Sequence, residues 1–181
     1  PCGTAGVCPL LRTDRGGRLR CLPVLDEYTR ECLAIEVEPS IGAQRVIMTL
    51  QQLFITRGVP TFIRSDNGPE FVAKAIQKWL AEKECGALFI TPGSPWENPF
   101  IESFNGKFRD ECLNREVFLN GREAKQIIEN WRCEYNTLRP HSSLGYLTPV
   151  EFAQQGAGSG RASPSLCRHP AETQSRLEIL S

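Results

Sequence analysis

The sequence predicts an α/β domain built on a mixed sheet, and three observations lead to this expectation. Two apolar-rich runs, residues 18–29 and 31–39, meet at Asp-Glu-Tyr-Thr-Arg and predict an antiparallel hairpin. Two shorter apolar runs, 61–65 and 87–91, have the length of buried strands. Amphipathic helical patterns separate and follow these runs, and strands that alternate with helices are typical of α/β folds.

The first helix is expected over residues 42–58. Val46, Leu50 and Leu53 recur at helical spacing, and the segment Gly58-Val-Pro60 ends the pattern. The strand at 61–65 follows directly. A second helix is expected to begin at residues 69–70 and to end at Gly86. Its inner side carries the apolar residues Phe71, Ile76, Trp79 and Leu80.

The C-terminal half predicts two more helices after a proline-rich loop at 92–99. The helix over 100–115 has an apolar stripe made of Ile101, Phe104, Phe108 and Cys112. A further amphipathic helix covers 122–139. From residue 154 the composition shifts to Gly, Ser, Ala and Pro, and such a segment buries too little apolar surface to offset the entropy of ordering it. We therefore expect a disordered tail over 154–181.

Composition limits the function classes that the chain can serve. The 181 residues can bury one core, and Lys+Arg and Asp+Glu are both 21, so the charge pattern is not that of a general nucleic-acid binder. Any contact with DNA must therefore be local. No apolar run approaches the roughly 18 residues of a transmembrane helix, so no membrane association is expected.

The eight cysteines do not suggest a disulfide scaffold or a zinc site. They lack regular spacing, no CxxC pair occurs, and the chain has only two histidines. We expect reduced thiols in a cytoplasmic protein.

Two carboxylates stand out as candidate catalytic residues. Asp66 ends the predicted strand 61–65 and precedes Asn-Gly, a strong turn signal, so its carboxylate is fixed at the end of a strand. Glu102 lies in the first turns of a predicted helix, with 35 residues between the two. On that helix Asn98 and Arg109 fall on the same side as Glu102, four residues before it and seven after. Such a polar face suits a phosphodiester lying across the helix.

Each of these residues also has a plainer interpretation. Asp-Asn-Gly is often only a turn, and Glu102 would interact favourably with the helix dipole in any protein. Asn98 is as well suited to capping the helix as to ordering a loop around DNA. Lys107 points obliquely from the Glu102 face, so a solvated lysine is an alternative to a DNA contact. These alternatives stay open at the level of single residues.

Four blocks together resemble the integrase catalytic core shared by retroviral integrases and insertion-sequence transposases. They are DEYTRECLAIEV, GVPTFIRSDNGPEF, SPWENPFIESFNGKFRDECLN and YNTLRPHSSLGYLTPVEF, and they lie within residues 18–152. The resemblance is closest to the second reading frame of insertion-sequence-three elements. It implies an RNase-H-like fold with a mixed five-stranded sheet flanked by helices. It also implies a division into a core with a helical extension at 18–153 and the tail at 154–181.

The resemblance implies metal-dependent DNA end cleavage and strand transfer, which makes the family a polynucleotidyl transferase. Asp66 and Glu102 match the second and third carboxylates of the family, which bind two Mg²⁺ or Mn²⁺ ions. Arg109 takes the place of a basic residue that contacts DNA, and we add Asn98 and Lys107 as DNA-binding candidates. The implied partners are the element ends and target DNA, further copies of the chain, and a helix-turn-helix protein from an upstream frame.

One departure from the family pattern concerns the first catalytic aspartate. It is expected 55 to 60 residues before Asp66, where the sequence reads GVCPLL and has no carboxylate. Asp14, in a turn, and Asp26, on the second strand, are not natural replacements. Residues 1–17 are therefore expected to be a degraded or out-of-frame segment, which leaves open whether the first strand is present. Two functions remain: a transposase core inactivated at one ligand, or a non-catalytic remnant that binds DNA or intact transposase.

Overall fold

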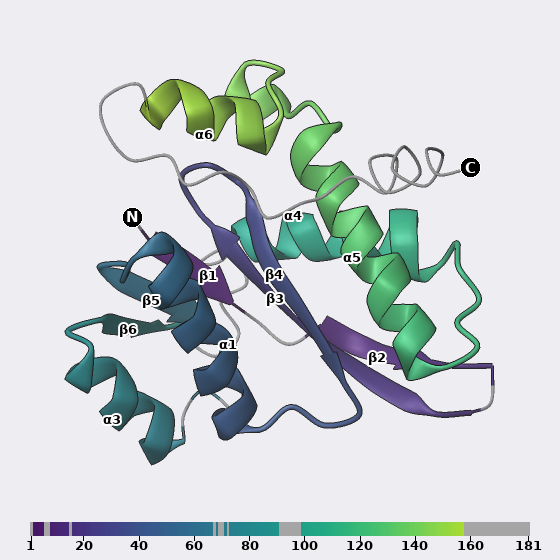
Figure 1. The fold of residues 1–181 in the computed structure, drawn as a ribbon, viewed down its shortest axis with the longest axis horizontal. Coiled ribbons are helices and arrows are strands. Elements are labelled where there is room, and N and C mark those ends of the chain that lie inside the picture. The colour runs from purple at the N-terminus through teal and green to yellow at the C-terminus, as the bar shows by residue number, and fades with distance from the viewer. Residues whose placement is uncertain are drawn as a thin grey trace, which may run out of the picture.

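The protein is described by a computed structural model that covers residues 2–5, 8–14, 16–66, 68, 71, 73–90 and 99–157. Its centre is a six-stranded mixed sheet with the order β2-β3-β1-β5-β6, in which β4 pairs with the other side of β3 (Figure 1). The strands are β1 Cys2–Ala5, β2 Cys8–Arg12, β3 Arg18–Asp26, β4 Cys32–Glu38, β5 Phe62–Ser65 and β6 Gly86–Phe89. The expected mixed α/β sheet is confirmed.

The first strand is present, which answers the question that the sequence left open. Both β1 and β2 pair antiparallel with β3, through Ala5 opposite Val24 and Cys8 opposite Cys21. Ala5 and Cys8 are three positions apart, and so are their partners Val24 and Cys21, so β1 and β2 share one register along β3. Because β1 and β2 follow one another along the same side of β3, the six strands fill the five strand positions that were expected in the sheet. Residues 2–5 and 8–12 belong to the same sheet as the rest of the core.

The other half of the sheet is parallel. β1 pairs with β5, with Ala5 opposite Ser65, and β5 pairs with β6. The prediction that Gly86 ends the second helix is wrong, because that helix ends at Glu82 and Gly86 is the first residue of β6. The ring of Phe62 lies over Gly86, where a Cβ atom would come within 2.3 Å of it. A larger residue at position 86 would therefore require the Phe62 ring to move.

The described residues form five α-helices, of which the first four agree in order with the prediction and the last was not predicted. They are α1 Ala43–Arg57, α3 Lys74–Glu82, α4 Pro99–Phe108, α5 Gly121–Thr137 and α6 Pro149–Ala157. The helix expected over 100–115 continues after α4 as a π-helical turn, Arg109–Leu113. Residues 154–157, expected to belong to a disordered tail, are helical, because α6 continues to Ala157. Residues 158–181 lie outside the described part of the chain.

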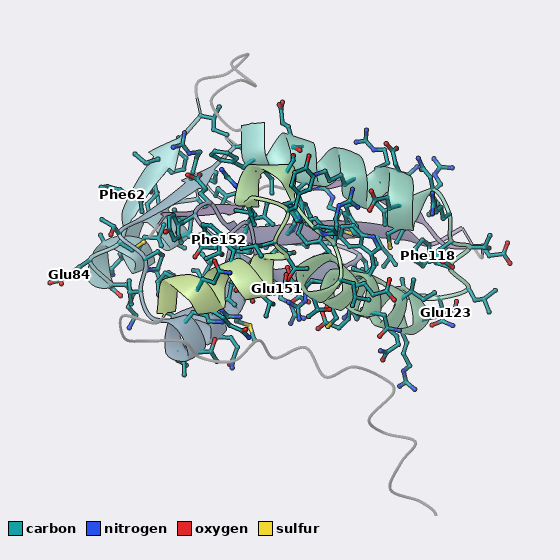
Figure 2. The ribbon with its side chains drawn as sticks, turned by 90° about the horizontal axis from the view of Figure 1, so that it is seen from above. Phe62, Glu84, Phe118, Glu123, Glu151 and Phe152 are labelled. Carbon is teal, nitrogen blue, oxygen red and sulfur yellow. The ribbon has the colours of Figure 1, made fainter. Side chains whose placement is uncertain are left out.

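Two apolar clusters cover the two faces of the sheet. Leu19 and Cys21 of β3 pack in a cluster with α4 and α5, whereas Leu22 and Val24 pack in a cluster with α1 and α3. Because successive strand residues point to opposite faces, the sheet lies between these helix pairs. Figure 2, viewed from above, shows Phe62 and Phe118 at opposite ends of this arrangement.

None of the helices in the described ranges has the length and apolar character needed to cross a membrane.

Candidate functional site

Asp66 lies where the sequence predicts it, directly after the last residue of β5. Its side chain is half-buried, and its Oδ1 accepts a hydrogen bond from the backbone N–H of Gly68 at 3.2 Å. This contact is an Asx turn, in which the side chain orients itself on the following backbone. Because β5 pairs on one side with β1 and on the other with β6, the carboxylate stands at the end of an interior strand.

The neighbouring strand offers Asp66 no carboxylate. In the β1–β5 register Thr4 is opposite Arg64 and Ala5 is opposite Ser65. The described residues of β1, Cys2–Ala5, therefore bring no acidic residue alongside the end of β5.

Glu102 lies in the first turns of α4, and its side chain is exposed. Ile101 and Phe104 on either side of it are buried in the apolar cluster, which fixes the face that α4 turns to the sheet. Since α4 also contacts β1, and β1 pairs with β5, both carboxylates belong to elements that adjoin β1. Within the described residues no three His, Cys, Asp or Glu side chains come close enough to hold a metal ion.

The three DNA-binding candidates differ in their placement. Arg109 is exposed at the start of the π-helical turn, and at 100° per residue it lies about 20° from Glu102 around the helix axis. Lys107 is about 140° from Glu102, and it is half-buried rather than fully solvated. Burial, followed by the nearby charge of Arg139, lowers the pKa of Lys107. Asn98 lies outside the described residues.

A set of basic residues that the sequence did not single out gathers on the Lys107 side of α4. Arg30, in the turn between β3 and β4, holds its guanidinium 3.6 Å from the centroid of the Phe100 ring. Arg139, just after α5, forms an ion pair with Glu111. No local sequence signal indicates this grouping, because its members come from three separate segments.

His141 lies beside these cations and is buried. Its ring meets the ring of Tyr135 edge-on, with centroids 5.0 Å apart. Burial lowers its pKa to about 4, with smaller contributions from Lys107 and Arg139. The imidazole is therefore neutral at pH 7, and its Nε2 has no hydrogen-bond partner among the described residues.

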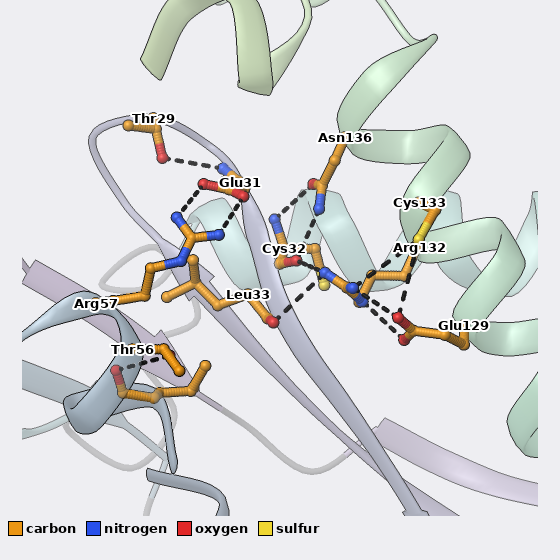
Figure 3. A network of polar contacts seen from close by, with 11 residues as sticks. Thr29, Glu31, Cys32, Leu33, Thr56, Arg57, Glu129, Arg132, Cys133 and Asn136 are labelled. Atoms are coloured by element: carbon orange, nitrogen blue, oxygen red, sulfur yellow. Dashed lines mark hydrogen bonds and ion pairs between the residues drawn. The ribbon is translucent and has the colours of Figure 1, made fainter. Parts of the chain in front are cut away.

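The turn that carries Arg30 is held from both sides (Figure 3). Glu31, only 3% exposed, forms two hydrogen bonds with Arg57 of α1, at 2.7 and 2.9 Å. The side chain of Asn136 in α5 accepts from the backbone N–H of Cys32 at 2.8 Å and donates to its carbonyl at 2.9 Å. Arg132 Nη1 donates to the same carbonyl at 2.8 Å. Buried polar groups thus fix the start of β4 against both helices.

Two family models, both described as integrase core domain, match residues 7–95 and 83–149. Together they cover the strands β2 to β6 and α4, including Asp66 and Glu102. The chain belongs to the integrase core family.

Relatives of this integrase core come from bacterial insertion elements. An uncharacterized protein of insertion element IS476 from Xanthomonas euvesicatoria is 45% identical over 75% of the chain and 39% of the relative. The corresponding protein of IS407 from Burkholderia multivorans is 44% identical over 77% of the chain and 50% of the relative. Transposase InsF of insertion sequence IS3fB from Escherichia coli is 28% identical over 83% and 53%. The integrase core is thus of the IS3 type, and the chain spans about half of these relatives or less.

Solved structures agree on the fold. A chain of the simian T-cell lymphotropic virus intasome, solved in complex with PP2A regulatory subunit B56 gamma, superposes with a TM-score of 0.70 at 16% identity, over 93% of this chain and 58% of that one. The HTLV-2 integrase catalytic core domain, solved in complex with magnesium, gives 0.62 at 14% identity, over 83% and 94%. The RNase-H-like integrase core fold expected from the resemblance is confirmed.

Proposed function

We propose that this integrase core acts in the transposition of an insertion sequence, as the part of a DNA transposase that handles the element ends and the target DNA. The observation that carries the proposal is the placement of Asp66 and Glu102. One ends an interior strand, the other lies on the helix that contacts β1, and both belong to an integrase core fold. In the family's reaction these carboxylates would be metal ligands that support end cleavage and strand transfer.

Asp66 and Glu102 are the residues of this chain that would hold Mg²⁺ or Mn²⁺. Carboxylate oxygens are the hard ligands that these ions prefer, and a bound pair of ions activates the attacking oxygen and stabilises the leaving one. Two carboxylates suffice to bind one hydrated cation. They do not complete a two-metal site, because β1 holds no acidic residue and the sequence at 6–11 reads GVCPLL.

A second function follows from this incomplete set of ligands. The chain as it stands is a non-catalytic integrase core, which binds DNA or an intact transposase without cutting. The complete sheet supports this proposal, because a folded domain can occupy DNA or join an oligomer without its chemistry. Arg109, on the Glu102 side of α4, is the proposed contact to the DNA ends, with Asn98 and Lys107 as further contacts. A helix-turn-helix protein from an upstream frame is the further partner expected.

One experiment separates the two functions. The 181-residue chain and its Gly6→Asp and Val7→Asp variants are incubated with a branched oligonucleotide that mimics the strand-transfer product, in Mn²⁺ or in EDTA. The parent should give no metal-dependent cleavage. Both variants should give cleavage, because they restore an aspartate 60 or 59 residues before Asp66, the separation that the resemblance to the family implies. Cleavage by the parent would refute the non-catalytic function.

The assignment of the ligands has its own control. Adding Asp66→Asn to the Gly6→Asp variant should abolish cleavage and weaken Mn²⁺ binding measured by calorimetry. If cleavage survives Asp66→Asn, Asp66 is not a catalytic ligand.

A further inference from the structure

We propose that Arg30, Lys107 and Arg139 form a second anion site, which binds a phosphate of the DNA backbone. The site lies on the side of α4 that faces away from Glu102, so it is separate from the carboxylate pair and from Arg109. The inference rests on the proposed function, because it takes DNA as the partner.

The three cations converge on one side of α4. Phe100 and Lys107 are seven residues apart, about two helical turns, and therefore lie on the same side of the helix. Arg30 stacks on the Phe100 ring at 3.6 Å, which brings its guanidinium to that side. Arg139 reaches the same side through its ion pair with Glu111, four residues beyond Lys107.

The positive charge at this place is only partly neutralised. Glu111 is the one carboxylate that pairs with any of the three cations within the described ranges, and it pairs with Arg139. Neither Arg30 nor Lys107 forms an ion pair with a described residue. Glu27 is offset by Arg64, and Asp26 adds a second carboxylate near Arg30, so three cations face two carboxylates and leave an excess of one positive charge in a chain whose formal net charge is zero.

The carboxylates nearest to Arg30 are engaged elsewhere. Glu27 receives a hydrogen bond from Arg64 at 3.0 Å. Asp26 uses its Oδ1 to accept the backbone N–H groups of Tyr28 and Thr29, which closes the turn. The Nη1 atom of Arg30 is buried and has no hydrogen-bond partner in the described part of the chain. A buried guanidinium nitrogen without an acceptor is costly, and an anion would supply the acceptor.

The surroundings favour an anion with several oxygens. Burial lowers the pKa of Arg30 and of Lys107, so their charged forms are less stable here than in water, and a bound anion would offset that loss. His141 is neutral and carries a buried nitrogen without a partner beside the same cations. The side chains of Arg139 and Glu111 are about one-third exposed, so an anion can reach the cluster from solvent. A phosphate offers oxygens to guanidinium groups arriving from different directions.

The test removes one charge without breaking an ion pair. Lys107→Gln leaves the Arg139–Glu111 pair intact, and Lys107→Arg keeps the charge. Lys78→Gln is the matched control, because Lys78 is 81% exposed on α3, far from the cluster in sequence. Binding of the full 181-residue chain to a fluorescent 30-base-pair duplex is measured in EDTA across a range of NaCl concentrations. One lost phosphate contact lowers the slope of log K against log salt by about 0.9.

The expected result is a lower slope and roughly 5- to 10-fold weaker binding at 0.1 M salt for Lys107→Gln, with parental behaviour for Lys107→Arg and Lys78→Gln. A parental slope for Lys107→Gln overturns the proposal. A second arm compares the melting temperature in inorganic phosphate and in chloride at equal ionic strength. If phosphate raises the melting temperature only when Lys107 is present, while the DNA slope is unchanged, the site takes free phosphate and the DNA assignment is overturned.

EDTA separates this test from the test of the proposed function. Metal-dependent cleavage does not enter the measurement, so a wrong assignment of Asp66 or Glu102 leaves the outcome unaffected. A parent chain that binds no DNA at any salt concentration would overturn both proposals.

Discussion

Asn136→Ala should be among the most destabilising substitutions in this protein. The side chain of Asn136 is fully buried, and it forms two hydrogen bonds with the backbone of Cys32 at the start of β4. In the alanine variant the Cys32 carbonyl keeps its bond from Arg132, but the Cys32 N–H loses the acceptor that Asn136 supplies. An unpaired buried N–H costs about 1–3 kcal/mol, and the second lost hydrogen bond adds about 1 kcal/mol. The expected loss is therefore about 2–4 kcal/mol.

The assay is urea unfolding at pH 7, followed by far-ultraviolet circular dichroism, with Gln126→Ala as the matched control. Gln126 is an exposed amide in the same helix, and its side chain bonds only to Asn130, at 3.0 Å, in the contacts described. Its removal should change the free energy of unfolding by no more than about 0.5 kcal/mol. If Asn136→Ala unfolds within 1 kcal/mol of the parent, roughly the limit of this comparison, then the Asn136 contacts do not hold β4 in place.

Three further outcomes follow from buried polar and thiol groups. Arg57→Ala leaves the carboxylate of Glu31 buried without its cation and should lower the free energy of unfolding in urea by about 2–4 kcal/mol. Adding Glu31→Gln should recover much of that loss, because the buried charge is then removed. The imidazole of His141 should titrate near pH 4 by NMR, and its signal is assigned by its absence in His141→Gln. Because the folded pKa lies below the ordinary value of 6.5, the unfolded chain binds this proton more readily between about pH 6.5 and pH 4. The free energy of unfolding should therefore fall over that range, by at most about 1.4 kcal/mol per pH unit. Cys112 is buried, and burial raises its pKa to about 12, so it should resist iodoacetamide at pH 8 in the folded chain and react after unfolding, as mass spectrometry of its peptide would show. Reaction in the folded state would mean that the π-helical turn Arg109–Leu113 opens readily.

The parts of the fold that the sequence predicted are those with strong local patterns. Ile101, Phe104 and Phe108 repeat at helical spacing, and all three are buried in α4. Asp66 follows a short apolar run and precedes a turn signal, and it lies directly after β5. In both cases the local sequence of a single segment was enough to predict its structure.

Helix α6 was not predicted, although a signal for it is present. Thr148 and Glu151 form a capping box, in which Glu151 Oε2 accepts from the Thr148 N–H at 2.8 Å and Thr148 Oγ1 accepts from the Glu151 N–H at 3.3 Å. Pro149 occupies the first helical position, which favours a helix start.

Other features depend on contacts that no local pattern reveals. β1 is short, rich in small residues and without alternation, so its strand conformation comes from pairing with β3 and β5 on its two sides. The cations Arg30, Lys107 and Arg139 are spread over more than 100 residues of sequence and meet only because α4, α5 and the β3–β4 turn pack together. Such groupings are properties of the tertiary fold.

The pairing of β1 with β5 also sets the order in which the chain can fold during synthesis. β1 finds its parallel partner about 60 residues later in the chain, which at 5 to 20 residues per second corresponds to roughly 3 to 12 s of translation. During that interval β1, β2, β3 and β4 can form an antiparallel sheet, but the side of β1 that later receives β5 is an open edge. A ribosome that stalls before residue 62 would therefore present an aggregation-prone edge, which a chaperone would have to cover until the parallel half emerges.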